Sequence, residues 1–402
     1  MKIEIPSYVR DVMDVLDAAG YRAYVVGGSL RDLLRGVIPH DYDMTTDATP
    51  EEMLSVFANY RVIPTGLAHG TVTVMSEGHP IEITTHRVDG SYTDARHPQT
   101  VSFTRALRED LSRRDFTVNA MAWHPKVGVV DLFSGREDLA LGVIRAVGDP
   151  ETRFREDALR ILRAFRFSAQ LDFEIDSETL AGAASAKEGL ARISVERIFA
   201  EVSRMLEAKN ADRGLRSMLA AGCEKYVFFD TVLALSPISI NALASNAALR
   251  AAALLPTLSR EEALAFSRRL HAPNAFGEAL AAYVEASRAT LPTSPYEARK
   301  FLSRYWHHWR GALAIAALRG VDVAEAEALC ARAARDGSVV EIRRLAVNGR
   351  ELQEKLGVRP AKTGELLVLL QDAVFRDPKC NKREALYALA QELCEKERDF
   401  LG

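Results

Sequence analysis

The chain has 402 residues, of which 48% are hydrophobic and 27% charged, which is enough for more than one globular domain. Its four cysteines are far apart and show no paired spacing, which excludes a disulfide framework or a structural zinc site and favours a reduced, cytoplasmic protein. No apolar run approaches the roughly 20 residues of a membrane span. The formal net charge of −3 does not indicate a general nucleic-acid binder, so any such contact must come from local basic surfaces.

The first 149 residues mix helical and extended periodicity. Apolar residues at helical spacing over 9–16 are followed by short alternating stretches at 71–75 and 81–85. Glu77 and Gly78, between these two stretches, are typical of a hairpin turn and predict antiparallel neighbours. We therefore predict a mixed α/β or α+β domain in this part of the chain.

A pair of glycines follows an apolar strand end and precedes a short helix. Gly27 and Gly28 allow backbone N–H groups to approach a triphosphate, and the helix start adds partial positive charge. Ser29 is able to cap that helix. A glycine pair in a tight turn is common, so this signal becomes specific only because two aspartates follow about a dozen residues later.

Those two aspartates, Asp41 and Asp43, stand two residues apart in a β-compatible run. If the run is a strand, both carboxylates lie on one face, with Tyr42 and Met44 on the other. Glu82 lies on the polar side of the second hairpin strand, so we expect three acids to converge. Clustered carboxylates repel one another unless a cation neutralises them, and oxygen-rich sites suit Mg²⁺ with waters and substrate phosphates. A D-x-D pair taken alone is more often a turn or a surface pair.

From Asp149 onward the sequence is rich in alanine and leucine at helical spacing, with almost no strand signal. Asp149 as N-cap, Pro150 in the first turn and Glu151 beside it predict that a long helix begins here. Further helix breaks are predicted at turn-prone stretches, at 210–214, 291–295 and 337–338.

The predicted helix from Asp149 has a charged face and an apolar face. At 100° per residue, its charged side chains fall within an arc of about 120°; they are Arg153, Glu156, Asp157, Arg160 and Arg163. A solvated surface with Glu156 and Arg160 as an i,i+4 pair explains the same pattern. Periodicity alone leaves both interpretations open.

Taken together, these segments resemble the nucleotidyltransferase superfamily of DNA polymerase β type, and within it the class II tRNA nucleotidyltransferases. The matching segments occur in family order over roughly the first half of the chain: GGSLRD at 27–32, DYD at 41–43, IEITTHR at 81–87, RRDFTVNAM at 113–121, REDALRILRAFRF at 155–167 and ISVER at 193–197. The second half matches in length and helical character.

The resemblance implies an α+β catalytic head of nucleotidyltransferase fold, with a mixed sheet of about five strands, followed by an all-α neck, body and tail. We place the head at 1–149, the nucleobase-selecting neck at 150–210, the body at 211–292 and a tRNA-binding tail at 293–402.

The resemblance also implies roles for individual residues. Asp41 and Asp43 would be the catalytic metal ligands, and Glu82 the third catalytic acid. The residues that would contact the triphosphate and ribose are Gly27, Gly28, Arg31, Arg114, Asp115 and Asn119. For the last three, helix-end capping and an i,i+4 pair are the alternative explanation.

The nucleobase-selecting residues implied on the neck are Glu156, Asp157, Arg160 and Arg163. Cytosine and adenine both present a ring-nitrogen acceptor beside an amino donor, so Arg160 would donate to the ring nitrogen while Asp157 accepts from the amino group. Guanine and uracil present the reverse order, at a cost of roughly 1–3 kcal/mol per unmet group. Glu156 would support Arg160.

The implied activity is addition of C, C and A to the 3′ end of tRNA from CTP and ATP, with Mg²⁺ as cofactor and release of pyrophosphate. The partners would be the acceptor end and elbow of tRNA, with no membrane. The segment 87–105 resembles the mobile loop that relatives use when they switch from C to A. The alternatives are an A-adding or CC-adding tRNA enzyme or a poly(A) polymerase; a non-catalytic RNA-binding homologue is disfavoured because the acids and the selecting residues are present.

Overall fold

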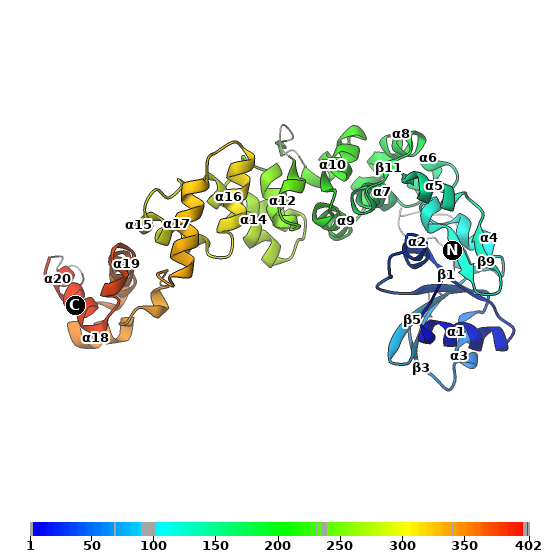
Figure 1. Cartoon of the computed structure of the whole chain (residues 1–402), viewed down its shortest axis with the longest axis horizontal. Helices are drawn as coiled ribbons and strands as arrows, with labels where there is room; N and C mark the ends of the chain where they lie inside the picture. Colours follow the sequence, from blue (N-terminus) through cyan, green and yellow to red (C-terminus); the bar gives the residue numbers. More distant parts are fainter. Residues whose placement is uncertain are drawn as a thin grey trace. The chain divides into compact units, whose positions relative to one another are not determined.

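The computed structural model describes residues 3–67, 70–89, 101–229, 231–234, 239–339, 341–396 and 400. The chain divides into two compact units, Met1–Thr231, drawn in blue to green, and Val232–Gly402, drawn in green to red (Figure 1). Across the described residues, no helix combines the length and the apolar character that a membrane span requires.

The first unit contains a mixed sheet that has seven strands among the described residues. Their order across the sheet is β3 (Arg61–Gly66), β4 (Thr71–Ser76), β5 (His79–Thr85), β2 (Asp43–Thr46), β1 (Ala23–Val26), β8 (Met121–His124) and β9 (Gly128–Asp131). Only the β2–β5 pair of this sheet is parallel. The sheet is wider than the sheet of about five strands that the family resemblance implied. Strands such as the evenly half-buried β9 also lack the alternation that marks a strand in sequence.

The predicted hairpin is confirmed. Strands β4 and β5 pair antiparallel, and both residues of the turn between them, Glu77 and Gly78, have positive φ angles of 49° and 82°. Two successive left-handed residues give a turn whose twist matches that of the strands it joins. The alternating burial along β4 places its apolar side chains on the core face of the sheet.

Helices α1 (Ser7–Ala18) and α3 (Pro50–Val56) cover one face of the sheet and both contact β4 (Figure 1). The predicted helical spacing over 9–16 is confirmed, since these apolar residues of α1 are buried in the main core. Helix α3 begins with a reciprocal capping box between Thr49 and Glu52. This packing leaves the acidic side chains at 43 and 82 on the opposite, open face.

The remaining elements of the head are short: α2 (Gly27–Leu34), β6 (Arg87–Asp89), β7 (Val101–Phe103), α4 (Leu107–Ser112), η2 (Thr117–Asn119), α5 (Gly135–Leu141) and β10 (Val143–Ile144). Strands β6 and β7 pair antiparallel. They form the base of the segment predicted to be a mobile loop, whose central residues 90–100 lie outside the described part of the chain.

The predicted single helix from Asp149 is wrong. Helix α6 (Pro150–Glu156) does begin there, with the Asp149 carboxylate accepting from Thr152 N, but it ends before Asp157. Asp157 is extended, with φ −140° and ψ 102°, and its carboxylate accepts from Leu159 N at 3.0 Å, at the start of α7 (Leu159–Leu171). A short acidic side chain that bonds nearby backbone competes with helix continuation.

The rest of the first unit is helical except for one short strand: β11 (Glu174–Ile175), α8 (Ser177–Ala186), η3 (Lys187–Arg192), α9 (Val195–Glu207), α10 (Ala211–Ala220) and α11 (Lys225–Phe228). Strand β11 pairs with β10 in parallel, which corrects the prediction that the chain is purely helical beyond Asp149. Helix α7 packs against both α9 and α10.

The described residues of the second unit form helices only: η4 (Ile240–Ala242), α12 (Ala247–Leu254), α13 (Arg260–Arg269), α14 (Asn274–Arg288), α15 (Pro295–Tyr305), α16 (Trp309–Leu318), α17 (Ala324–Arg335), η5 (Ile342–Arg344), α18 (Gly349–Leu356), α19 (Pro360–Arg376), η6 (Pro378–Cys380) and α20 (Arg383–Lys396). The helix breaks predicted near 291–295 and 337–338 are confirmed, because α14 and α17 end just before these positions. The break predicted at 210–214 lies earlier, between the end of α9 at Glu207 and the start of α10 at Ala211.

Candidate active site

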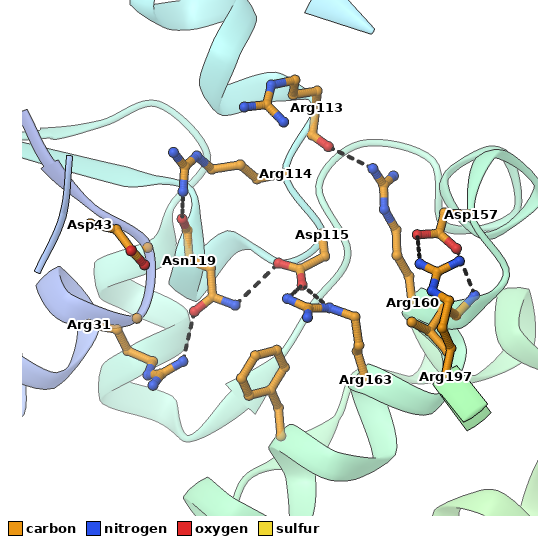
Figure 2. A pocket seen from close by; sticks show the side chains of 14 residues that line it. Arg31, Asp43, Arg113, Arg114, Asp115, Asn119, Asp157, Arg160, Arg163 and Arg197 are labelled. Atoms are coloured by element: carbon orange, nitrogen blue, oxygen red, sulfur yellow. Dashed lines mark hydrogen bonds and ion pairs between the residues drawn. The ribbon is translucent and has the colours of Figure 1, made fainter. Parts of the chain in front are cut away.

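A pocket of about 440 Å³ opens on the acidic side of the first unit (Figure 2). It is lined by Gly27, Gly28, Arg31, Asp43, Arg113, Arg114, Asp115, Asn119, Asp157, Leu159, Arg160, Arg163, Phe167 and Arg197. The sequence-predicted residues are therefore gathered here, apart from Asp41, Glu82 and Glu156. Segments far apart in the sequence supply the lining, and most of its polar side chains are arginines.

The start of helix α2 forms one wall of the pocket. No side chain of the described residues caps this end, so its first-turn N–H groups remain available to an anion. Gly27 has a φ of +67°, and a Cβ there would lie 3.3 Å from Arg114 Nη1. Glycine at this position therefore suits both the backbone conformation and the close approach of an arginine.

The predicted capping role of Ser29 is wrong. Its hydroxyl donates to Val26 O at 3.2 Å and accepts from Asp43 N at 2.9 Å. The side chain thus ties the first residue of β2 to helix α2 instead of satisfying the helix start. This bond helps to hold Asp43 at the pocket.

The parallel register of β2 and β5 places Asp43 directly opposite Glu82. Burial raises the pKa of the Asp43 carboxyl above its ordinary value. The negative charges of Glu82 and Asp41 raise the pKa of Asp43 further, whereas the positive charge of Arg114 opposes them. The three acids therefore interact electrostatically at one edge of the pocket.

The expectation that these acids form one compact cluster is not met. Strand β2 begins at Asp43, so Asp41 lies outside the pleat, with its exposed carboxylate 3.0 Å from His40 Nδ1. Within the described residues, no three His, Cys, Asp or Glu side chains are close enough to hold a metal ion. Mg²⁺ needs only one or two carboxylates when waters and substrate phosphates complete its shell, so Asp41 and Asp43 still provide suitable hard oxygen donors.

Glu82 instead lines an adjacent pocket of about 250 Å³, together with Val26, Asp43, Met44, Thr71, Thr84, Arg87, Arg113 and Arg114. Asp43, Arg113 and Arg114 line both pockets. The third acid therefore lies in a pocket that shares three lining residues with the larger one.

A chain of hydrogen bonds crosses the back of the main pocket (Figure 2). Arg31 Nη1 donates to Asn119 Oδ1 at 2.9 Å, and Asn119 Nδ2 donates to Asp115 Oδ1 at 3.2 Å. Arg163 donates twice to Asp115 Oδ2, at 2.8 and 2.6 Å. Burial would raise the pKa of Asp115, but the charge and hydrogen bonds of Arg163 lower it to about 2.

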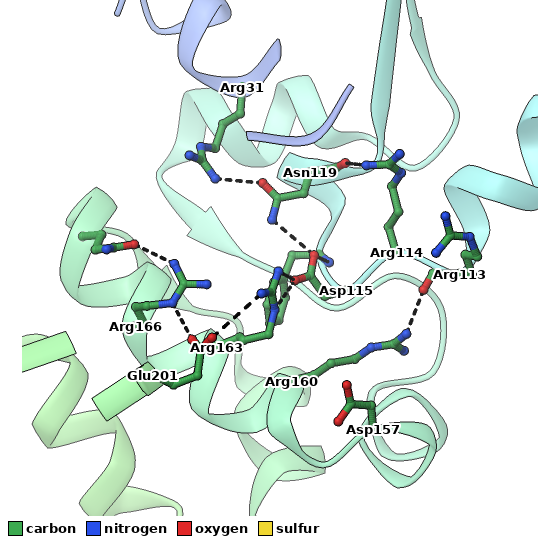
Figure 3. A network of polar contacts seen from close by, with 12 residues as sticks. Arg31, Arg113, Arg114, Asp115, Asn119, Asp157, Arg160, Arg163, Arg166 and Glu201 are labelled. Atoms are coloured by element: carbon green, nitrogen blue, oxygen red, sulfur yellow. Dashed lines mark hydrogen bonds and ion pairs between the residues drawn. The ribbon is translucent and has the colours of Figure 1, made fainter. Parts of the chain in front are cut away.

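Arginine side chains also surround one aromatic ring. The guanidinium groups of Arg31 and Arg163 each lie 5.3 Å from the centre of the Phe167 ring, and that of Arg166 lies 4.0 Å from it. Such contacts hold cations in place without using their N–H donors. Arg166 and Arg163 both lie near the buried carboxylate of Glu201 (Figure 3).

Two of the predicted nucleobase-selecting residues, Asp157 and Arg160, lie side by side in the pocket lining, whereas Arg163 bonds to Asp115 and Glu156 lies outside the lining. Arg160 Nη1 donates to Glu156 Oε2 at 2.9 Å, which is the predicted i,i+4 contact. Asp157 Oδ2 lies 3.3 Å from Arg197 Nη2, so a helix more than 30 residues later holds this carboxylate. The break between α6 and α7 turns Asp157 toward the pocket beside Arg160 (Figure 2).

Four lining residues were not predicted: Arg113, Leu159, Phe167 and Arg197. Arg113 and Arg197 lie inside the motifs RRDFTVNAM and ISVER, so the motifs carried a signal that was not assigned to these side chains. Leu159 and Phe167 look like core residues in sequence, and only the tertiary arrangement shows that their surfaces reach the pocket.

Comparisons with known proteins identify the family of this chain. Residues 23–145 match the family model of the Poly A polymerase head domain, and residues 172–231 match that of the probable RNA and SrmB-binding site of polymerase A. The CCA-adding enzyme of Ligilactobacillus salivarius is 34% identical over 401 residues, which cover 97% of this chain and 98% of that protein. This chain belongs to the family of CCA-adding enzymes.

Other CCA-adding enzymes support the same assignment. That of Leuconostoc mesenteroides is 49% identical over 208 residues, which cover 52% of this chain and 51% of that protein. The crystal structure of the Bacillus stearothermophilus CCA-adding enzyme in complex with CTP matches with a TM-score of 0.83 and 30% identity, over 97% of this chain and 98% of that chain. The Thermotoga maritima CCA-adding enzyme complexed with tRNA, at 22% identity and a TM-score of 0.68, shares the fold.

These matches confirm the resemblance to tRNA nucleotidyltransferases and the predicted fold class of a mixed-sheet head followed by a mostly helical remainder. CCA-adding enzymes are nucleotidyltransferases, and this family generally uses a divalent metal ion.

Proposed function

We propose that this chain adds C, C and A to the 3′ end of tRNA, using CTP and ATP and releasing pyrophosphate. The observation that carries the proposal is one pocket that joins the start of α2, Asp43, and the Asp157 and Arg160 pair, in a member of the CCA-adding family. Related structures are complexes with CTP, ATP and tRNA, and we extend these ligands to this chain.

The triphosphate would lie between the start of α2 and the arginines of the opposite wall. Backbone N–H groups at Gly27 and Gly28 and the side chains of Arg31 and Arg114 supply donors and positive charge for its oxygens. Asp115 and Asn119 hold Arg163 and Arg31 in fixed positions. They would also contact the ribose side of the nucleotide. This arrangement orients the α-phosphorus for attack by the tRNA hydroxyl.

We propose Mg²⁺ as the divalent ion, bound by Asp41 and Asp43, with Glu82 as the third acid of the catalytic face. When bound, the ion lowers the pKa of the attacking 3′ hydroxyl and neutralises charge on the departing pyrophosphate. The carboxylates themselves position the ion; burial first, and then the neighbouring acids, raise the pKa of Asp43, so a cation at this position would stabilise its charged form.

Base selection would rest on the hydrogen-bonding pattern that Asp157 and Arg160 present. Arg160 is fixed through Nη1 and Nη2 by Glu156, by Arg153 O and by Arg113 O, whereas its Nε donates to no described residue. Each Asp157 oxygen accepts one bond from the protein and retains a second lone pair. A donor and an acceptor are therefore left for the ring nitrogen and amino group of cytosine or adenine.

The Asp157→Asn variant tests base selection, because it keeps the shape and replaces one acceptor by a donor. We expect CTP and ATP incorporation to fall about 10- to 100-fold, equivalent to roughly 1–3 kcal/mol, and the share of UTP and GTP to rise. The measurement is competition among the four NTPs on tRNA that lacks its 3′ CCA. Asp149→Asn is the matched control, since asparagine caps helix α6 equally well. Unchanged discrimination in Asp157→Asn would falsify the assignment.

Product length separates full CCA addition from its alternatives. The purified protein is incubated with tRNAs that end before, within or after CCA, with each NTP separately and with CTP and ATP together. Full addition gives three nucleotides on the shortest tRNA and none on the complete one. An A-adding or CC-adding enzyme stops short, and a poly(A) polymerase produces a ladder with ATP alone.

The remaining assignments belong to the same proposal. The head would span 1–149, the neck 150–210, the body 211–292 and the tail 293–402, with the tail contacting the tRNA elbow through phosphate contacts. The segment 87–105 would move when the enzyme switches from C to A. We place the chain in the cytoplasm, the compartment in which tRNA, CTP and ATP meet.

A further inference from the structure

Asp110, on helix α4, is fully buried. Each of its two carboxylate oxygens bonds to a different arginine. Oδ1 accepts from Arg113 Nε at 3.0 Å and from Arg113 Nη2 at 2.6 Å, and Oδ2 accepts from Arg114 Nη2 at 3.2 Å. Asp110 lies outside the family motifs quoted above. It also lines neither pocket, although both of its arginine partners do.

The two arginines are adjacent in sequence and both line the two pockets that share Asp43. Without a counter-charge, neighbouring guanidinium groups repel one another and turn toward solvent. A single buried carboxylate between them neutralises this repulsion and limits their rotamers. Burial would raise the pKa of Asp110, but the two arginines lower it to about 2, so the carboxylate stays charged at neutral pH.

Asp110 also contacts two elements that carry other parts of the site. Thr45 Oγ1, on strand β2, lies 3.4 Å from Oδ2, and Arg87 N, at the start of β6, lies 3.4 Å from Oδ1. Strand β2 carries Asp43, and β6 begins the segment proposed to move during the switch from C to A. These longer contacts connect the arginine pair to the catalytic strand and to the base of that segment.

The contacts continue from the arginines into the rest of the pocket (Figure 3). Arg160 Nη2 donates to Arg113 O at 3.0 Å, so the residue whose side chain Asp110 holds also supports the proposed base-selecting arginine through its backbone. Arg114 Nη1 donates to Asn119 O at 3.4 Å. Displacement of the arginine pair would therefore change the proposed contacts with both the triphosphate and the base of the nucleotide.

We propose that Asp110 is a positioning residue that holds Arg113 and Arg114 as a paired contact for the triphosphate of the incoming NTP. This inference rests on the proposed function, which it extends by adding Arg113 to the triphosphate contacts and by naming the group that orients both arginines. Preorganised donors raise affinity for charge because no rearrangement is needed when the ligand binds.

The test is the affinity of the full-length protein for CTP, CDP and CMP, measured by titration calorimetry. In Asp110→Asn, CTP binding should weaken about 10- to 100-fold and CMP binding less than about 3-fold, with CDP between them, because the loss follows the number of phosphates. A merely structural defect would weaken all three nucleotides equally, and this outcome, like unchanged CTP binding, overturns the proposal.

Two further variants keep the test decisive. Asp110→Glu retains the charge and displaces the carboxylate by one methylene, so it should show the same dependence on phosphate number even if Asp110→Asn does not fold. Glu109→Gln, at the preceding exposed position, contacts Thr104 and should bind all three nucleotides like the wild type. Extension of tRNA by the wild type is measured in parallel: its absence refutes the proposed function, whereas normal extension with unchanged Asp110 variants refutes only the positioning role.

Discussion

Asp115 shows how a single residue links the stability of the pocket to its chemistry. Its carboxylate is buried, and the side chains that bond to it, Arg163 and Asn119, are themselves pocket residues. The lowered pKa of Asp115 means that the folded state binds its proton more weakly than the unfolded chain does. Folding is therefore favoured by this group wherever the carboxylate is ionised.

We expect Asp115→Asn to destabilise the protein by about 1–3 kcal/mol at pH 7, because Arg163 loses its charged partner. A group with a depressed folded-state pKa contributes fully above its ordinary pKa near 4, and this contribution is lost as the pH falls through about 2. The stability difference between wild type and variant should therefore shrink between pH 4 and pH 2, as measured by calorimetric unfolding.

The control is Asp172→Asn, at a half-exposed position where asparagine also tolerates the left-handed backbone. Its effect should stay within about 0.5 kcal/mol, the scale of exposed ion pairs. A pH-independent difference between wild type and Asp115→Asn would show that packing, and not the ionised carboxylate, is what the variant loses.

At the scale of elements, the break between α6 and α7 has the largest consequence for the site. A continuous helix would keep Glu156, Asp157 and Arg160 on one surface, whereas the break lets Asp157 adopt an extended conformation between two helices. The position of α6 then depends on its neighbours. Helix α8 packs directly against α6, and its Gly182 provides the close approach.

We expect Gly182→Ala to destabilise the protein by about 1–3 kcal/mol and to lower nucleotide addition. A Cβ at this position would lie 2.7 Å from Pro150 Cβ and 3.1 Å from Glu151 N, so the start of α6 must shift. Because α6 carries Glu156, the support of Arg160 shifts with it. Thermal unfolding and kcat/KM for CTP are the measurements.

Gly364→Ala, in the exposed interior of α19, is the control, since nothing lies within 4 Å of its added Cβ. It should stabilise the protein by about 0.5–1 kcal/mol through helix propensity. If Gly182→Ala is equally stabilising, the close packing of α8 on α6 is not the constraint inferred here.

At the scale of the whole molecule, every residue that lines the candidate active site belongs to the unit Met1–Thr231. The second unit has helical cores of its own. Some basic side chains on its last helices are paired with acids of the same helix, for example Arg350 with Glu354 at 2.7 Å and Lys362 with Glu365 at 2.8 Å. Exposed pairs of this kind are weak, so these cations can exchange their partners for phosphates.

We therefore expect a fragment that ends at Thr231 to bind CTP within about 3-fold of the full chain and to bind tRNA at least about 10-fold more weakly, because it lacks phosphate contacts of the tail. Filter binding of tRNA at several salt concentrations is the measurement, and the full chain should show the steeper salt dependence. Equal tRNA affinity of fragment and full chain would place the tRNA contacts entirely in the first unit.

Local rules were enough to predict several features from the sequence. The hairpin at Glu77 and Gly78, the helix start at Asp149 and the helical spacing over 9–16 depend on residues within a few positions of one another. Period-2 alternation, capping side chains and turn residues act over that same short range. The family motifs then identified most of the pocket residues from the sequence alone.

Tertiary structure alone decided the remaining features. Arg163 meets Asp115 across 48 residues, and Arg197 meets Asp157 across 40, so neither pairing follows from helical or strand periodicity. The same holds for Asp110, whose local sequence resembles an ordinary charged helix. Sequence patterns specify which groups each segment can offer, but the charge pairs that orient those groups form only when distant segments pack together and exclude water.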